Sequence, residues 1–370
     1  MSKTSETILE INLAHLTHNF NHLKSKLDPE VKVLAVVKAS GYGSDAAIIA
    51  RHLEKIGADY FAVAYTSEGI QLRDAGITTP ILVLHPQPVN FQKLIDYQLE
   101  PSVYSARVLK EFLVTAKLNG KKHYPIHVKF NTGLNRIGFD ESDVDYITKQ
   151  ISATDVIKVV SLLSHLAASE DYNEREFTLN QINSFKQIAN KVSAKLGYTP
   201  ILHQSNTSGI FNYPEAHFDM VRTGIGLYGY GNEAKYDTQL KPVMSLKSVI
   251  SQIHDMQPGD SLGYNRAFIA SEATKTATIP IGHADGIGRQ YGNKKGYVII
   301  HNQRAYILGN VCMDMIMVDI TTIDCKEGDE VIIFGSESSA ANIAEHSGTI
   351  SYELLTAVSP RVKRTVIDDK

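Results

Sequence analysis

The first 240 residues of the chain alternate short apolar runs with stretches whose apolar residues follow helical spacing. The apolar runs lie at 31–39, 59–65, 80–85, 100–105, 124–131, 158–166, 200–206 and 220–229. Segments 44–57 and 178–197 are examples of the helical stretches between them. Strands that alternate with helices predict a parallel sheet, and eight such units over residues 12–240 fit a (β/α)8 TIM-like barrel. An open, doubly wound sheet is the alternative on the pattern alone.

The pattern changes after residue 240. Helical spacing fades, turn sequences such as 256–265 and 326–331 accumulate, and short apolar runs lie between them. These features predict a mostly antiparallel β domain over residues 241–370, so the fold class is α/β with a second, β-rich domain. The N-terminal segment 1–11 is strand-like, and we expect it to pair with this second domain. Segment 350–366 is expected to contain a helix with Ser351 and Glu353 in its first turn.

Composition narrows the classes of function. With 370 residues, 43% of them hydrophobic and 21% charged, the chain is typical of a soluble protein of two domains. A net charge of -3 suggests no basic face, so we expect no nucleic-acid partner. Two cysteines indicate a reducing compartment, and no apolar run is long enough to span a bilayer. We therefore expect a cytoplasmic protein without a membrane partner.

Lys38 is the first candidate for chemistry. It follows the apolar run 33–37 and precedes the small residues Ala39, Ser40 and Gly41. Lysine is almost never fully buried without a partner, and burial lowers its pKa, which suits a base or a Schiff-base lysine. A lysine that extends from a strand end into solvent is the ordinary alternative, and this segment alone leaves both interpretations open.

Other polar residues follow the remaining predicted strands. Barrel enzymes place their chemistry at the C-terminal ends of the strands, and these ends carry Lys38, Lys129, Arg136, His165, Asn206, Thr207 and Arg222. The amides of Gly224 and Ile225 and the hydroxyl of Thr207 can hold a phosphate group. A Schiff-base lysine beside a phosphate site suggests pyridoxal phosphate as the cofactor, and no metal is expected.

Ordered motifs along essentially the whole chain carry a family resemblance. VVKASGYG, KFNTGLNRIGF, HQSNTSG, VRTGIGLYG, LGYNRAF, GHADG, GNVCMD and ISYELLT follow one another in this order. The chain resembles the alanine racemase family, pyridoxal-phosphate enzymes with a barrel domain and a β domain. The resemblance implies an isomerase that converts L-alanine to D-alanine for peptidoglycan, working as a homodimer whose subunits share active sites.

The resemblance also implies a role for each matching residue. Lys38 would bind the cofactor covalently and act as one base, and Tyr264 from the second subunit would be the opposite base. Removal of the Cα proton on one face and its replacement on the other requires two such groups. At the cofactor, the resemblance places Arg222 at the pyridine nitrogen, Arg136 at the phenolic oxygen and His165 against the ring, with the cofactor and its phosphate surrounded by Tyr42, Asn206, Thr207, Gly224, Ile225 and Tyr352. The substrate carboxylate would be met by Arg136 and by Cys312, Met313 and Asp314. His283 and Arg289 would lie at the entryway, and Lys129 would be a carbamylated lysine.

Departures from the family pattern keep alternatives open. Asn131 replaces a usual aspartate, Asn310 an arginine, and His283 a tyrosine, which could widen the entryway or make it pH-sensitive. A racemase of serine or of basic amino acids therefore remains an alternative. A decarboxylase of related architecture is disfavoured by Arg222 and by the lack of a glycine triplet. Without the resemblance, Tyr264, His165, Lys129 and the arginines could equally be structural residues.

Overall fold

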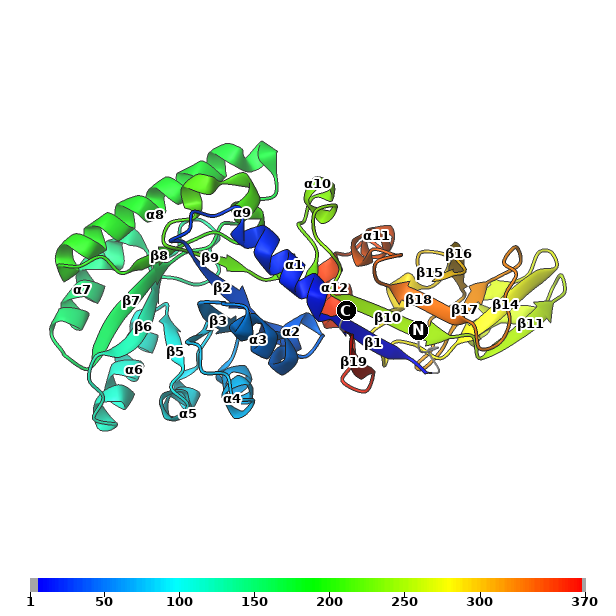
Figure 1. Cartoon of the computed structure of the whole chain (residues 1–370), viewed down its shortest axis with the longest axis horizontal. Helices are drawn as coiled ribbons and strands as arrows, with labels where there is room; N and C mark the ends of the chain where they lie inside the picture. Colours follow the sequence, from blue (N-terminus) through cyan, green and yellow to red (C-terminus); the bar gives the residue numbers. More distant parts are fainter. Residues whose placement is uncertain (1–5, 368–370) are drawn as a thin grey trace.

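The computed structural model describes residues 6–367, which form a barrel lobe and a β-rich lobe (Figure 1). Residues 1–5 and 368–370, at the edges of the two predicted β segments, lie outside the described part. Eight parallel strands build the barrel: β2 (Lys32–Val36), β3 (Tyr60–Val63), β4 (Ile81–Val83), β5 (Glu100–Val103), β6 (Tyr124–Lys129), β7 (Ile157–Leu163), β8 (Ile201–His203) and β9 (Met220–Thr223). Their order is β8-β7-β6-β5-β4-β3-β2-β9.

Backbone hydrogen bonds join the two ends of this sheet. The Asp219 amide donates to the Leu202 carbonyl and the Arg222 amide donates to the Ser205 carbonyl, each at 3.1 Å. The predicted barrel is therefore confirmed, and the doubly wound alternative is wrong, because an open sheet would leave these groups apart. Most apolar side chains of the strands are buried, as the near-continuous hydrophobic runs predicted, while Ile201 and Leu202 of β8 are partly buried.

Helices surround the barrel. They are α1 (Leu13–Lys24), α2 (Lys38–Tyr42), α3 (Ala46–Lys55), α4 (Thr66–Asp74), α5 (Phe91–Asp96), α6 (Ala106–Leu118), α7 (Val144–Ser152), α8 (Arg175–Leu196), α9 (Thr207–Asn212) and α10 (Ala234–Asp237). The two predicted helical stretches correspond to α3 and α8. Within residues 6–367, no helix combines the length and apolar character needed to cross a bilayer.

All eight barrel strands end before the predicted runs do, and two of them lead into distinctive turns. The first run was predicted as a strand to residue 39, but β2 ends at Val36 and a tight turn follows. The last run was predicted to residue 229, but β9 ends at Thr223, and Ile225–Tyr228 forms a 3-10 turn. In both places glycines follow a hydrophobic strand, and the backbone turns toward the C-terminal mouth of the barrel.

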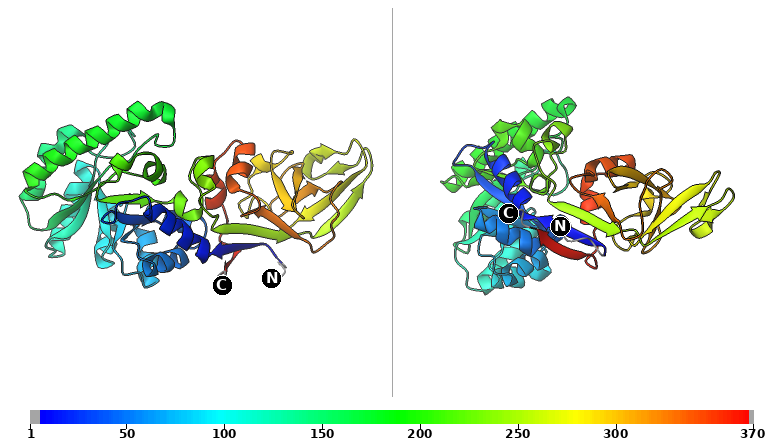
Figure 2. Two further views of the ribbon diagram at one scale, coloured as in Figure 1. Left: turned by 45° about the horizontal axis from the view of Figure 1, so that its top comes forward. Right: turned by 45° about the vertical axis from the view of Figure 1, so that its right-hand side comes forward.

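The strands of the second lobe are mostly antiparallel, as predicted. They are β10 (Met244–Val249), β11 (Gln252–Met256), β12 (Ser261–Leu262), β13 (Phe268–Ile269), β14 (Thr274–Ile279), β15 (Tyr297–Ile300), β16 (Gln303–Leu308), β17 (Ile316–Asp319), β18 (Glu330–Phe334) and β19 (Lys363–Ile367). The helices α11 (Ala340–His346) and α12 (Ser351–Thr356) lie next to the barrel lobe (Figure 2). The second of these is the helix predicted in segment 350–366.

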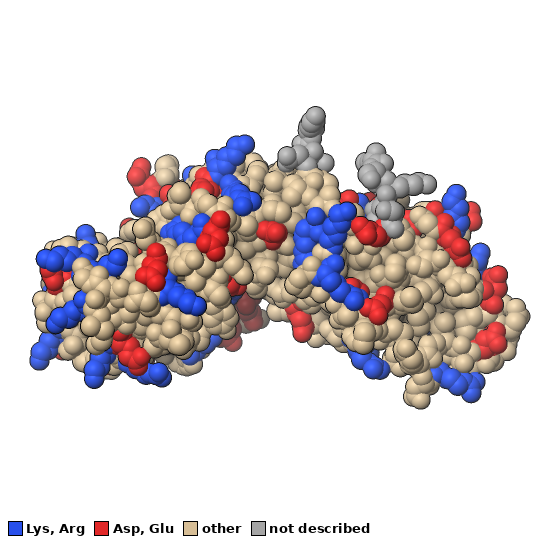
Figure 3. All heavy atoms as spheres, turned by 90° about the horizontal axis from the view of Figure 1, so that it is seen from below, with Lys and Arg blue, Asp and Glu red and all other residues tan. Residues whose placement is uncertain are grey.

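The N-terminal strand β1 (Ile8–Asn12) belongs to the second lobe, as predicted. It pairs antiparallel with β10 and parallel with β19, within a nine-stranded sheet of order β11-β14-β17-β16-β15-β18-β10-β1-β19. Helix α1 follows β1 directly and packs on the barrel, so one continuous segment ties the lobes together. Figure 3 shows the surface hollowed between the lobes, with acidic and basic side chains interspersed on that face.

Candidate active site

A cavity of about 620 Å³ opens at the C-terminal mouth of the barrel. Its walls come from residues that follow at least six different strands, as the position of active sites in barrel enzymes predicts. Of the predicted site residues, the cavity brings together Lys38, Tyr42, Lys129, Arg136, His165, Asn206, Thr207, Arg222, Gly224, Ile225 and Tyr352. These residues come from segments that lie between positions 38 and 352 of the chain.

Lys38 is held by an unusual backbone conformation. Ala39, Ser40, Gly41 and Tyr42 all have φ between 53° and 65°, which makes one turn of left-handed helix. Such a turn costs about 1–2 kcal/mol for each residue with a Cβ, so surrounding contacts must hold it in place. The Glu68 carboxylate is one of them, because it accepts hydrogen bonds from the amide of Ala39 at 2.6 Å and from the amide of Ala64 at 2.7 Å.

Burial also prepares Lys38 for chemistry. Desolvation lowers the pKa of its amine, and the positive charge of Arg136 lowers it further, while Glu68 acts in the opposite direction. A lowered pKa favours the neutral amine, which is the form that can attack a carbonyl carbon or take up a proton.

The rim opposite Lys38 is narrow and rich in hydroxyl groups. A Cβ on Gly224 would lie 2.1 Å from the Tyr42 hydroxyl oxygen, so only glycine fits there. The Tyr42 ring stacks on Tyr228 with 4.6 Å between ring centroids, and it also contacts Tyr352. The Thr207 hydroxyl accepts a hydrogen bond from the Gly226 amide at 3.3 Å. This rim has the small residues and donors that bind a phosphate group.

Asn206 lines the same cavity, but its side-chain oxygen is already engaged. That oxygen accepts hydrogen bonds from the Gly209 amide at 2.9 Å and from the Ser169 hydroxyl at 2.7 Å. Asn206 is therefore the N-cap of α9, and it fixes the turn that presents Thr207 to the cavity.

Arg222 is buried at the floor of the cavity. Its guanidinium donates to the carbonyls of Ser164, His203 and Gln204, at 2.6, 3.0 and 3.0 Å. It also lies 2.9 Å from Nδ1 of His165 and 2.9 Å from Nδ1 of His203. Burial and the charge of Arg136 lower the pKa of Arg222 to about 9. Because a guanidinium can only donate, both histidines must accept through Nδ1.

Lys129 lies among cations in a buried place. Desolvation, followed by the charges of Arg222, Arg136 and Lys38, lowers the pKa of the Lys129 amine to about 7. Asn131, the departure from the family pattern, braces the neighbouring loop. Its side-chain oxygen accepts from the amides of Gly133 and Asn135, and its amide donates to the Asn135 side chain.

The other predicted residues lie on the β-rich lobe and do not line this cavity. Tyr264 is 76% exposed and Met313 is 59% exposed. The loop that contains His283 is joined to the loop that contains Met313, because the amides of His283 and Ala284 donate to the carbonyls of Cys312 and Met313, each at 3.0 Å. Arg289, also exposed, begins the 3-10 turn Arg289–Tyr291.

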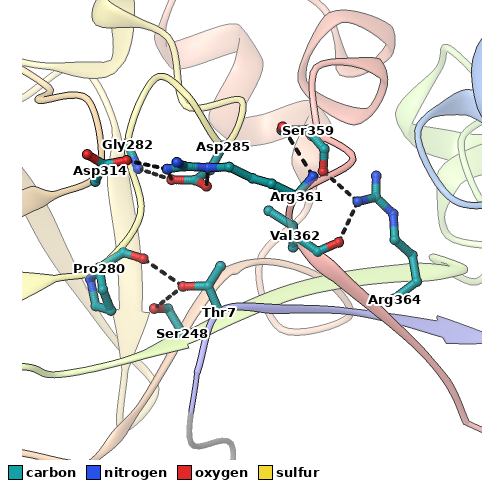
Figure 4. Close-up of polar contacts among 10 residues, drawn as sticks. All are labelled: Thr7, Ser248, Pro280, Gly282, Asp285, Asp314, Ser359, Arg361, Val362 and Arg364. Carbon is teal, nitrogen blue, oxygen red and sulfur yellow. Dashed lines mark hydrogen bonds and ion pairs between the residues drawn. The ribbon is translucent and has the colours of Figure 1, made fainter.

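An ion cluster fixes these two loops to the C-terminal segment (Figure 4). Arg361 donates to both oxygens of Asp285, at 2.6 and 3.1 Å, and it also pairs with Asp314. Asp285 in turn accepts from the Gly282 amide at 2.8 Å. Asp314, predicted near the substrate carboxylate, is thus paired with a cation in this chain. Arg361 is a positioning residue that sequence reasoning missed.

Several other residues of the site were also missed. Tyr65 and His85 line the cavity after β3 and β4. The rule that identified Lys38 and His165 could have found them, since both follow predicted strands. No signal in the local sequence marks Glu68 or His203, because their roles arise only from contacts with distant segments.

The barrel, its lysine-containing pocket and the attached antiparallel domain together define an enzyme of the two-domain racemase class. Comparisons with known proteins specify the family. Residues 11–232 match the family described as "Alanine racemase, N-terminal domain", and residues 243–366 match "Alanine racemase, C-terminal domain". The chain belongs to the alanine racemase family.

Individual relatives are similar over nearly their full lengths. The alanine racemase of Halothermothrix orenii is 36% identical, over 98% of this chain and 97% of that protein. The solved alanine racemase of Clostridium difficile 630 superposes with a TM-score of 0.92 at 37% identity, covering 99% of this chain and 97% of the other. The Bartonella henselae alanine racemase, solved with covalently bound pyridoxal phosphate, has a TM-score of 0.89 at 29% identity, covering 98% and 100%.

The pocket fits pyridoxal phosphate on its own chemistry. Lys38 supplies a buried amine of lowered pKa, and Gly224 leaves space that a Cβ would fill beside the hydroxyl-rich rim. Arg222 also lines this cavity, where its guanidinium can donate to an aromatic ring nitrogen. These three features match the aldehyde, phosphate and pyridine ends of the cofactor.

Proposed function

We propose that this protein interconverts L-alanine and D-alanine with pyridoxal phosphate, and that Lys38 and Tyr264 of the partner subunit act as the two bases. The observation that carries the proposal is the single cavity that joins Lys38, Arg222 and the glycine- and hydroxyl-rich rim. The names of relatives similar over the full chain support the choice of alanine.

Each residue has a defined task in this proposal. Pyridoxal phosphate, when bound, supplies the electron-withdrawing system that acidifies the Cα–H of an amino acid. The Lys38 amine takes up or returns the proton on one face, which its lowered pKa favours. The Tyr264 hydroxyl does the same on the other face. Arg136 pairs with the substrate carboxylate, as an arginine fork suits a carboxylate.

Arg222 tunes the reaction. An arginine gives up a proton reluctantly, so a ring nitrogen beside it stays unprotonated. Electron withdrawal is then weaker than with an acidic partner, which limits side reactions such as transamination and decarboxylation. Tyr42, Thr207, Gly224, Ile225 and Tyr352 would hold the phosphate, with Thr207 oriented by the Asn206 cap.

The shared site explains why Tyr264 is exposed and remote from the cavity of its own chain. We propose a homodimer in which the joined loops 280–286 and 310–315 of each subunit, with Tyr264, complete the site of the other. His283 and Arg289 then border the entryway. The product would supply D-alanine for peptidoglycan synthesis in the cytoplasm.

One observation favours a second candidate, a racemase of basic amino acids. A neighbouring cavity of about 760 Å³ shares Arg136, His165 and Tyr352 with the first. Four carboxylates also line it: Glu170, Glu233, Asp237 and Glu345. Carboxylates at the approach to a site attract cationic substrates.

A chiral amino-acid assay separates the candidates. The protein with added pyridoxal phosphate is incubated with L-alanine, L-serine, L-lysine or L-arginine, and both enantiomers are quantified over time. The proposal expects L-alanine to approach an equal mixture much faster than the others. Faster conversion of lysine or arginine would replace the first candidate by the second, and no racemisation of any of them would refute both.

A further inference from the structure

A series of hydrogen-bonded, buried polar side chains leads from Arg222 away from the cavity. His203 Nε2 lies 2.9 Å from the Ser161 hydroxyl, which lies 2.5 Å from Nδ1 of His127. Nε2 of His127 lies 2.7 Å from the Glu100 carboxylate. The five residues come one each from β9, β8, β7, β6 and β5, which are consecutive around the barrel. Glu100 is the first residue of β5, so the series leads from the mouth toward the opposite end.

The direction of every hydrogen bond follows from Arg222. Its guanidinium only donates, so Nδ1 of His203 accepts and the ring proton of a neutral His203 lies on Nε2. The His203 Nε2–H then donates to Ser161. Burial and the charge of Arg222 lower the pKa of His203 well below its usual value, which agrees with a neutral ring.

The second half of the series follows by the same logic. Ser161, having accepted from His203, donates its hydroxyl proton to Nδ1 of His127. His127 therefore carries its ring proton on Nε2 and donates it to Glu100. A doubly protonated His127 would direct its Nδ1–H at the Ser161 oxygen. The Ser161 hydroxyl proton would then have no acceptor among the residues of this series.

All four hydrogen bonds thus donate toward one carboxylate. We propose that Glu100, His127 and Ser161 are positioning residues of the active site. They act through His203 to hold the Arg222 guanidinium in place, with His203 and His127 both neutral. Aligned hydrogen bonds polarise one another, so a negative charge at Glu100 strengthens acceptance at His203. This inference rests on the proposed contact between Arg222 and the cofactor ring.

Three other titratable side chains lie near Glu100: Arg73, Tyr60 and Tyr124. Burial lowers the pKa of Arg73, and the nearby charge of Glu100 opposes this shift. Burial raises the pKa of Tyr60 to about 12, and the Glu100 charge contributes in the same direction. Tyr124, whose pKa is also raised by burial and then by Glu100, remains neutral.

The first test reads proton positions without reference to turnover. Neutron diffraction from deuterium-exchanged crystals of the holoenzyme is expected to show deuterium on Nε2 of His203 and of His127. It should also show the Ser161 deuterium directed at Nδ1 of His127. Deuterium on Nδ1 of His127, or on both of its nitrogens, would overturn the proposal.

The second test separates positioning from mere packing. Ser161→Ala interrupts the hydrogen-bonded series, and it is expected to lower kcat for alanine about tenfold, the size of one lost hydrogen bond, with KM changed less than twofold. Ser102→Ala is the matched control, because Ser102 is equally buried and its hydroxyl has no hydrogen-bond partner among residues 6–367.

The control is expected to keep the wild-type kcat. A kcat within twofold of wild type in Ser161→Ala would overturn the proposal. If Ser161→Ala fails to fold, Glu100→Gln keeps the size of the end group and removes its charge, and a smaller loss of kcat is expected. An unchanged kcat in Glu100→Gln would overturn the proposed positioning role of Glu100. A wild-type enzyme inactive on every amino acid would refute the proposed function. The neutron result would still decide whether the hydrogen bonds from Arg222 to Glu100 have the proposed directions.

Discussion

The surroundings of Lys129 change its affinity for a proton. Its folded-state pKa of about 7 lies below the usual value of 10.5, so it binds its proton more weakly when folded. The free energy of unfolding should therefore rise between pH 7 and 10.5, where the unfolded chain binds more protons. The stabilising contribution is complete above pH 10.5 and is lost as the pH falls through 7.

Urea unfolding at pH 7 and pH 9.5 tests this expectation in CO2-free buffer. Lys129→Met should reduce the rise in the free energy of unfolding relative to wild type, because methionine does not titrate. A carbamylated Lys129 would carry a negative charge beside Arg136 and Arg222 instead. Labelled bicarbonate should then give a carbamate carbon signal in 13C NMR that is absent from Lys129→Met. If the free energy of unfolding rises equally between pH 7 and pH 9.5 in wild type and in Lys129→Met without CO2, the lowered pKa of Lys129 would be contradicted.

Gly224 tests the phosphate rim at the scale of one methyl group. In Gly224→Ala the new Cβ would overlap the Tyr42 hydroxyl, and stacking on Tyr228 prevents the ring from retreating. Overpacking of this kind costs about 1–3 kcal/mol, so we expect pyridoxal phosphate to bind about tenfold or more weakly. Titration of the apo protein by absorbance measures this, and an unchanged Kd would show that the rim does not hold the cofactor.

At the scale of elements, the left-handed turn after β2 depends on Glu68. A glutamine there keeps one oxygen but turns an NH2 toward amides that also donate, so Glu68→Gln should release Ala39 and displace Lys38. We expect kcat to fall at least tenfold, together with a loss of about 1.5–3 kcal/mol in stability. Steady-state kinetics and urea unfolding measure the two effects.

Glu54→Gln provides the control for that variant. Glu54 likewise accepts from two backbone amides, those of Thr78 and Thr79, but it does not line the cavity. It should lose stability and keep its kcat. Equal losses of kcat in both variants would mean that the turn has no special role.

Hydrophobic periodicity predicted the elements well because each strand and helix buries its own apolar residues. The eight barrel strands and the β-lobe strands followed from runs such as 124–131, now β6. Strand ends were predicted less well. The ends of β2 and β9 depend on the left-handed turn and on the turn after Gly224, which local apolar residues do not encode. Glu68, His203 and Arg361 were missed because their partners lie far away along the chain.

At the scale of the whole molecule, the proposal divides each active site between two chains. Lys38→Ala and Tyr264→Phe homodimers should each be inactive. After subunit exchange at equal amounts, half of the dimers are mixed, and each holds one complete site, so about a quarter of wild-type activity should return. Mass spectrometry of the intact dimer verifies the exchange, and no recovery after it would count against a shared site.

The pairing of β1 between β10 and β19 bears on how the protein is made. During synthesis β1 precedes both of its partners, because β10 begins at Met244 and β19 begins at Lys363. The nine-stranded sheet is therefore completed only after residues 363–367 have been synthesised. The barrel can close on the ribosome, while β1 waits as an exposed edge that other nascent chains could capture. Folding of the second lobe therefore depends on β1 remaining available until β10 and β19 have been synthesised.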